Sequence, residues 1–207
     1  MAEETIIHSY RVKYDSGLAP CIYDLDRKPT GCLTLACCKK NMRRSIGSKF
    51  KDKIANKKAD VFVLGVYGVT KLLYFAKITE VVTMVDYFTD SKYKNRLDNI
   101  YDVLSIEPLR YKRNKNTNPH HIHPEDCEHN DDWAGEYVLI SDCFAYWGKK
   151  CPELPQNLLD ILPRCKYSFD PDQQKEIIGF VRNQNLWDFE TLIQNEPNEL
   201  KLLDAAR

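Results

Sequence analysis

Two long apolar segments, residues 61–67 and 72–82, flank a short turn at Gly68 and constrain the fold more than any other feature. Each segment is rich in the aliphatic, β-branched and aromatic residues that are enriched in strands. The short glycine-containing connection predicts that the two strands form an antiparallel hairpin. Their apolar residues are nearly continuous rather than alternating, which predicts burial on both faces, as in a small closed β-barrel.

Local patterns predict the other elements of the first 150 residues. Residues 6–13 are apolar and β-prone and predict a first strand, whereas residues 18–31 lack periodicity and predict a surface loop. Thr34 is a candidate cap for a short helix within residues 31–46, in which Cys37 and Cys38 would face inward. Further along, we expect a lysine-rich connector at 49–60, a short helix at 83–93, a turn at 98–101, a long polar loop from 107, and two paired strands at 137–140 and 144–147.

The end of the chain is predicted to be helical. Asp170-Pro171-Asp172-Gln173 combines an N-cap residue, a proline at the first helical position and a glutamine at the third, which is a helix-start signature. We predict helices at 155–162, 170–183, 186–193 and 197–206. The expected fold class is α+β, with a small mixed or antiparallel β-barrel and peripheral helices in residues 1–168. A helical C-terminal extension, residues 169–207, would pack on it.

The composition narrows the functional class. The apolar fraction of 43% over 207 residues is ordinary for a globular protein. No apolar run approaches the length of a membrane span and no signal peptide is present, so we expect a cytoplasmic protein without a membrane partner. In that compartment the eight cysteines are expected to be reduced thiols.

The charge is zero overall but unevenly distributed. Residues 39–58 carry nine lysines and arginines against Asp52 alone. Such a basic element suits an anionic ligand or nucleic acid, and the adjacent Arg43 and Arg44 suit bidentate binding of a phosphate. The alternative is a solvated cationic helix with no ligand.

The segment Asp98-Asn99-Ile100-Tyr101 also allows two interpretations. Asn and Asp side chains in turns usually bond their own backbone. The functional alternative is that Asn99 and Tyr101 face a ligand, because an amide can read a base edge and a tyrosine can stack on a base.

Four of the five histidines lie in residues 119–133, together with one cysteine. His120, His123, Cys127 and His129 are possible zinc ligands. Structural zinc usually requires two separated ligand pairs, so one short loop would need Cys37, Cys38 or Cys143 as a distant ligand. We therefore predict no metal or other cofactor, with zinc as the minor alternative. Neither a family-type nucleophilic cysteine nor a phosphate-binding glycine loop is present in the sequence.

Several blocks in this order resemble a known family. The blocks are Ser9-Tyr10, Asp15-Ser16-Gly17-Leu18-Ala19-Pro20, Cys32-Leu33-Thr34-Leu35-Ala36-Cys37-Cys38-Lys39 with Arg43-Arg44, Leu73-Tyr74-Phe75-Ala76-Lys77-Ile78-Thr79-Glu80, Asp98-Asn99-Ile100-Tyr101, and Tyr137-Val138-Leu139-Ile140-Ser141 with Phe144-Ala145-Tyr146-Trp147-Gly148. Over roughly residues 6–182 the chain resembles the second of the bacterial and phage families called nucleotide modification associated domains. A hairpin followed by a short helix is also similar to PUA-like modules, a group that includes base-reading domains; this step is an analogy of fold.

The resemblance implies a role near modified nucleotides. It marks one set of positions as candidate ligand-binding residues: Thr34, Lys39, Arg43, Arg44, Asp98, Asn99, Tyr101 and Ser141. The family-like blocks around residues 119–133 imply that this stretch is a lid, in which His121, His123 and Asp126 would close a nucleotide pocket.

Three functional hypotheses follow. The first is a domain that binds a nucleotide or a modified nucleobase, with DNA as the expected partner, in a base-modification or phage-defence setting. The second is an enzyme that processes a nucleotide or base, with a histidine or carboxylate of residues 119–133 as acid or base. The third is an adaptor that docks a modification enzyme through residues 184–207.

Overall fold

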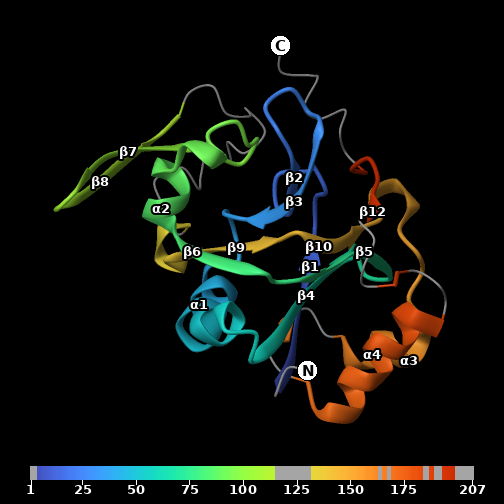
Figure 1. Ribbon diagram of the computed structural model, residues 1–207. Coiled ribbons are helices and arrows are strands. Elements are labelled where there is room, and N and C mark those ends of the chain that lie inside the picture. The colour runs from blue at the N-terminus through green and yellow to red at the C-terminus, as the bar shows by residue number, and fades with distance from the viewer. Residues whose placement is uncertain are drawn as a thin grey trace.

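The computed structural model describes residues 4–114, 132–162, 165–166, 169–183, 187–188 and 193–198. The larger of the two main sheets has the strand order β11-β1-β4-β5-β10-β12 (Figure 1). Its strands are β1 (Glu4–Val12), β4 (Ala59–Tyr67), β5 (Lys71–Lys77), β10 (Cys143–Tyr146), β11 (Cys165–Lys166) and β12 (Ile193–Gln194). Strands β1 and β4 are parallel, and β4 and β5 form the antiparallel hairpin that the apolar segments predict.

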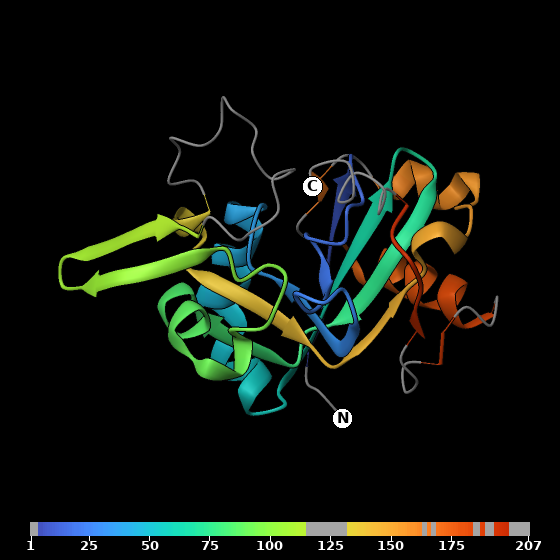
Figure 2. The ribbon, with the colours of Figure 1, turned by 90° about the horizontal axis from the view of Figure 1, so that it is seen from above.

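The second sheet has the order β2-β3-β9-β6. Its strands are β2 (Cys21–Tyr23), β3 (Pro29–Leu35), β6 (Glu80–Thr83) and β9 (Tyr137–Ser141). A separate hairpin of β7 (Tyr101–Ile106) and β8 (Leu109–Arg113) pairs only with itself among the described strands and projects from the body of the molecule. Figure 2 shows this projection from above.

Four α-helices are described: α1 (Lys40–Ala55), α2 (Met84–Thr89), α3 (Gln156–Ile161) and α4 (Pro171–Asn183). Three short 3-10 turns accompany them: η1 (Ser91–Tyr93), η3 (Trp133–Gly135) and η4 (Gly148–Lys150). Figure 2 shows α3 and α4 on one side of the β4–β5 hairpin and α1 and α2 on the other. Among the described helices, none is long and apolar enough to span a membrane.

Alternation of side chains along the strands produces three apolar clusters. Residues on one face of the larger sheet, such as Val61 and Val63, pack with the second sheet and with the apolar face of α1. Residues on its other face, such as Phe62 and Leu64, pack against α3 and α4. The second sheet likewise covers a third cluster that contains Tyr87 and Phe88 of α2. Both faces of the central hairpin are therefore buried, as its continuous apolar pattern predicts.

The closed barrel predicted from the sequence is not observed. The described strands form two main open sheets and the separate β7–β8 hairpin, because β9 pairs with β3 and β6 while β10 pairs with β5 and β12. The predicted pairing of 137–140 with 144–147 is wrong for the same reason. The fold is a mixed α+β arrangement of several sheets and few helices.

Five local predictions are also corrected. Residues 18–31 are not a surface loop, because Cys21 and Ile22 are completely buried in β2. Thr34 caps no helix and lies in β3, and α1 occupies most of the predicted lysine-rich connector. The polar stretch after residue 107 contains β8, and Ile193 lies in a strand rather than in a helix.

Other local predictions are confirmed. The strand at 6–13 corresponds to β1, the helix at 83–93 to α2 and η1, and the helix at 155–162 to α3. The helix-start signature is correct as well, because Asp170 Oδ1 accepts hydrogen bonds from the backbone nitrogens of Asp172 and Gln173.

Candidate functional site

The N-terminus of α1 begins with a tight backbone turn. Cys38 and Lys39 both have positive φ, at 61° and 47°, and no side chain caps the helix. The ammonium of Lys39 donates to the carbonyl of Arg11 at 3.3 Å and lies 4.7 Å from the centroid of the Tyr10 ring. The turn is held from outside by Asp132, whose Oδ1 accepts from the Cys38 nitrogen at 2.6 Å.

Arg43 lies one turn into α1 and is completely buried. Its Nε donates to the Cys38 carbonyl at 2.8 Å, its Nη2 to the Asp132 carbonyl at 2.5 Å, and its Nη1 to the Tyr137 carbonyl. The guanidinium also packs against Gly135, where an added Cβ would lie only 2.5 Å away. Burial lowers the pKa of Arg43. In this structure the side chain binds protein acceptors and is not presented at the surface.

Asp132 joins this turn to the first strand of the projecting hairpin. Its Oδ2 accepts a hydrogen bond from the Tyr101 hydroxyl at 3.0 Å. Burial, followed by the negative charge of Asp132, raises the pKa of Tyr101, which keeps the hydroxyl protonated as a donor. Cys38, Arg43, Tyr101 and Asp132 are called the Asp132 junction below.

The described residues on either side of 115–131, Asn114 and Asp132, lie next to each other's partners at the Asp132 junction. Asn114 donates its backbone N–H to the carbonyl of Ile100, the residue before Tyr101, at 2.8 Å. Asp132 itself begins the next described stretch. The chain therefore leaves this place at Asn114 and returns to it at Asp132.

An aromatic cluster continues from the Asp132 junction into the hairpin. Tyr111 of β8 stacks on Trp133, with 4.1 Å between ring centroids and 17° between ring planes. Tyr101 meets the edge of Trp133 at 5.6 Å, and Phe88 of α2 lies at the same distance from it. Trp133 is buried and Tyr111 is half-buried.

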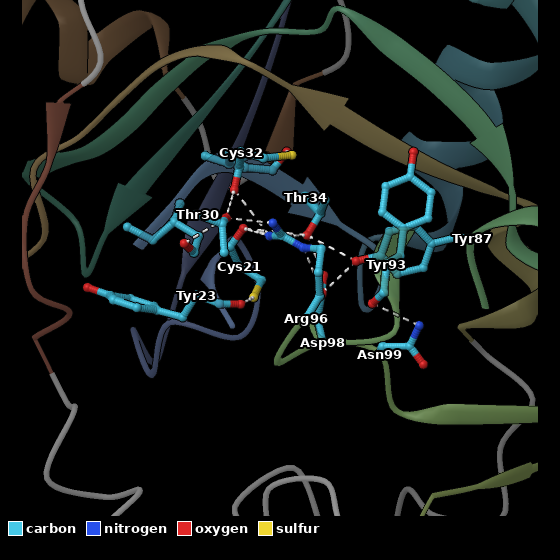
Figure 3. Close-up of polar contacts among 12 residues, drawn as sticks. Cys21, Tyr23, Thr30, Cys32, Thr34, Tyr87, Tyr93, Arg96, Asp98 and Asn99 are labelled. Carbon is cyan, nitrogen blue, oxygen red and sulfur yellow. Dashed lines mark hydrogen bonds and ion pairs between the residues drawn. The ribbon is translucent and has the colours of Figure 1, made fainter. Parts of the chain in front are cut away.

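Thr34 and Asp98 are brought together in a separate buried network (Figure 3). Asp98 accepts from the hydroxyl of Thr34 at 2.5 Å and from that of Tyr87 at 2.6 Å. Arg96 forms an ion pair with Asp98 at 3.5 Å and donates to Thr34 at 2.9 Å. Its Nη2 also donates to the carbonyl of Cys21 at 2.7 Å.

This network ties β2, β3, α2 and the 96–98 turn together. Burial, followed by the negative charge of Asp98, raises the pKa of Tyr87 well above its ordinary value, so Tyr87 remains a neutral donor. Each carboxylate oxygen of Asp98 has a short hydroxyl donor, which is what a buried carboxylate requires. The hydroxyl and guanidinium groups of the network therefore contact the Asp98 carboxylate from within the protein.

The other predicted site residues lie apart. Asn99 is buried and its side-chain amide donates to the Tyr93 carbonyl at 3.2 Å. Arg44 is half-exposed and forms an ion pair with Glu136 at 2.9 Å. Ser141 is buried on β9, where its hydroxyl donates to the Cys143 carbonyl at 2.8 Å.

The histidine and zinc predictions fall on residues outside the described part of the chain: His120, His121, His123, Asp126, Cys127 and His129. Of the possible distant ligands, Cys37 is buried and Cys38 is exposed. Burial raises the pKa of the Cys37 thiol well above its ordinary value, which disfavours the thiolate form that binds zinc. Within the described ranges, no group of three or more His, Cys, Asp and Glu residues could hold a metal ion.

Sequence reasoning did not identify Asp132 or Arg96 as central residues. Asp132 is one of several acidic residues in a polar stretch, and Arg96 lies in a short turn among other charged residues. Their importance depends on partners such as Thr34 and Cys38, which lie 62 and 94 positions away along the chain. The available local signal is that Asp132 directly precedes Trp133.

A comparison with known families matches nearly the whole chain. The family model for nucleotide modification associated domain 2 covers residues 4–203. No curated protein and no solved structure matches the sequence significantly. Of the sequence blocks that resemble this family, Thr34 and Asp98 lie in the buried network, and Arg43 and Tyr101 lie at the Asp132 junction. The chain belongs to the nucleotide modification associated domain 2 family.

Proposed function

We propose that this protein binds a nucleotide or a modified nucleobase, with DNA as the macromolecule that carries it, in a base-modification or phage-defence setting in the cytoplasm. Membership of a family named for nucleotide modification supports this context. The proposal retains the analogy with PUA-like base-reading modules at the level of function, although the described sheets are open.

One observation carries the proposal. Half-buried Tyr111, stacked on buried Trp133, lies next to the N-terminus of α1, which no side chain caps, and Asp132 is hydrogen-bonded to that turn. A base can stack on an aromatic ring, and the first-turn N–H groups of a helix favour a phosphate. The two halves of a nucleotide therefore have complementary groups in one neighbourhood.

The structure changes the roles that we assign to the predicted residues. Arg43 and Tyr101 use their donors on protein groups, so we assign them to positioning the turn and Asp132. Arg44 is the better phosphate ligand, because its ion pair with Glu136 is exposed and an exposed pair costs little to exchange. Asn114 and Asp132 lie next to this candidate site, through hydrogen bonds to Ile100 and Tyr101.

The test is a binding measurement with a panel of nucleoside monophosphates that includes modified bases. Isothermal titration calorimetry on the full chain measures affinity, and native mass spectrometry reports any nucleotide retained during purification. Stacking contributes about 1–3 kcal/mol per base, so Tyr111→Ala is expected to weaken binding by roughly 5- to 150-fold.

Tyr14→Ala is the matched control, because Tyr14 is 53% exposed and takes no part in the aromatic cluster. It should bind like the wild type. Equal affinity of Tyr111→Ala and wild type, or no binding by wild type to any member of the panel, would overturn the proposal.

A further inference from the structure

The β7–β8 hairpin projects from the body as a two-stranded arm (Figures 1 and 2). Its strands pair with each other from Tyr101↔Arg113 to Ile106↔Leu109 and belong to neither of the two larger sheets. The base of the arm is fixed by the packing of Tyr101 and Tyr111 on Trp133. Beyond Val103, which pairs with Tyr111, the three remaining residues of β7 extend about 10 Å at roughly 3.3 Å per residue.

The outer part of the arm exposes three large apolar side chains, together with the acidic Glu107 in its turn. Leu104 is 59% exposed, Ile106 is 61% exposed and Leu109 is 44% exposed. These are three of the six large apolar side chains that are exposed in the described part of the chain. Ile106 and Leu109 face each other across the turn of Glu107 and Pro108, so the apolar side chains gather at the tip.

The returning strand is basic. β8 contains Arg110, Lys112 and Arg113 within five residues. Arg110 is exposed and lies opposite Ser105, and the exposed Lys112 pairs with Asp102 only at 3.8 Å. Arg110 is therefore next to the apolar tip, while Lys112 and Arg113 lie nearer the base of the same ribbon.

We propose that the β7–β8 arm enters a groove of duplex DNA, with its apolar tip against the base pairs and the β8 cations on the flanking phosphates. This rests on the proposed function and deepens it, since it names duplex DNA as the form in which the base is presented. A two-stranded ribbon fits the major groove, and apolar side chains inserted from the minor groove wedge base steps apart.

The surface area at the tip favours DNA over a second copy of the chain. Three partly exposed aliphatic side chains present no more than a few hundred Å², whereas a stable protein interface buries about 800 Å² on each partner. Lysine, which β8 supplies as Lys112, is depleted in protein interfaces, whereas lysine and arginine both make the contacts with phosphates that DNA binding requires. A small apolar tip with basic residues on the same ribbon meets the needs of a groove.

The experiment measures fluorescence anisotropy of an end-labelled 20-base-pair duplex with the full chain and two tip variants. The double variant Ile106→Ser/Leu109→Ser is expected to bind at least about tenfold more weakly and to lose any bend of the duplex measured by energy transfer between its ends. Arg110→Gln is expected to lower the slope of log affinity against log salt by about one. Val69→Ser is the control, because Val69 is a 56% exposed apolar residue on the turn of another hairpin.

The outcomes separate this inference from the proposed function. If the wild type binds free nucleotides but not the duplex, or if the tip variant binds the duplex like the wild type, the arm has another role while the nucleotide site stands. Loss of nucleotide binding in Tyr111→Ala supports the nucleotide site, and the duplex affinities of the tip variants decide the role of the arm. A tip variant that changes from dimer to monomer by sedimentation, with duplex affinity unchanged, would assign the arm to self-association and overturn the inference.

Discussion

Replacing Arg96 by methionine tests whether the buried network around Asp98 stabilises the fold. Arg96 is 5% exposed and Asp98 is completely buried. Methionine keeps much of the aliphatic volume but removes the cation and its hydrogen bonds, including those to the carbonyls of Cys21 and Cys32. The carboxylate then stays buried without its counter-charge.

Breaking a buried ion pair from one side costs about 3–5 kcal/mol. In a domain of this size each kcal/mol lowers Tm by about 2–4 °C, so Arg96→Met is expected to lower Tm by roughly 6–20 °C. Thermal and urea unfolding followed by circular dichroism measure this directly. Arg44→Met is the matched control, because its ion pair with Glu136 is about half-exposed, and we expect a change below about 1 kcal/mol.

A double-mutant cycle identifies the source of the loss. If Arg96 acts mainly through Asp98, then adding Asp98→Asn to Arg96→Met should cost less than the sum of the two single changes, by about 1–3 kcal/mol. Two results would refute the reasoning: a fall in Tm of less than about 3 °C for Arg96→Met, or strictly additive changes in the cycle. Unchanged stability together with lost nucleotide binding would instead assign the network, including Thr34, to the ligand.

Three further predictions concern stability. Burial and nearby Lys49 lower the pKa of His8 from 6.5 to about 4, so between these pH values the unfolded chain binds more protons than the folded one. The stability that His8 contributes is therefore complete above pH 6.5, and the free energy of unfolding should fall by about 2 kcal/mol from about pH 7.5 to about pH 5. Urea unfolding measures this fall, and the His8→Phe variant should show little of it. Gly47→Ala should destabilise by about 1–3 kcal/mol despite better helix propensity, because its Cβ would lie 2.2 Å from the Tyr137 ring, and a higher Tm would contradict this. Asn198→Ala removes amide hydrogen bonds to Asp15 and Gly148, at 2.9 and 3.1 Å, and should cost about 1–3 kcal/mol in the same assay; an unchanged unfolding midpoint would show that this contact stabilises nothing.

The sequence was most informative where the determining interactions are local. The β4–β5 hairpin depends on two neighbouring apolar segments and a short turn, and α4 depends on the cap at Asp170. Residues 29–35 were misassigned because Thr34 resembles a helix cap when its strand partners on β2 and β9 are unknown. Pairing of β12 with β10 joins residues that are 48 positions apart, which no local pattern predicts.

The sequence predicted several residues of the candidate site but not what each of them binds. Adjacent arginines suggested one phosphate clamp, yet successive helical residues point about 100° apart. One guanidinium is therefore completely buried against Gly135, and the other forms an exposed ion pair with Glu136. Side-chain chemistry identified Arg43 and Tyr101 as important, but only their distance from Asp132 shows which groups they bind.

The described part of the C-terminal tail is built into the body of the protein. Residues 193–198, called the C-terminal strap, add β12 to the larger sheet. Asn195 donates its backbone N–H to the Tyr146 carbonyl, and its own carbonyl accepts from the Tyr23 hydroxyl. The backbone N–H of Asn198 donates to buried Asp15 at 2.8 Å. The strap thus connects the second sheet, through Tyr23 of β2, to the far edge of the larger one.

This arrangement changes how an adaptor role for residues 184–207 has to be tested. Deleting the whole segment would remove the strap and leave Asp15 with only the Tyr146 hydroxyl among these donors. Burial already raises the pKa of Asp15, and the hydrogen bonds from Tyr146 and Asn198 oppose that rise. Without the Asn198 donors the buried carboxyl group would lack those hydrogen-bond partners, which favours partial unfolding. A lost complex would then report the damaged body rather than a missing contact. Charge reversal at Glu196, whose exposed carboxylate pairs with Lys149 at 2.7 Å, alters the outer face of the strap while β12 stays in place, and it is the cleaner way to ask whether a partner enzyme binds there.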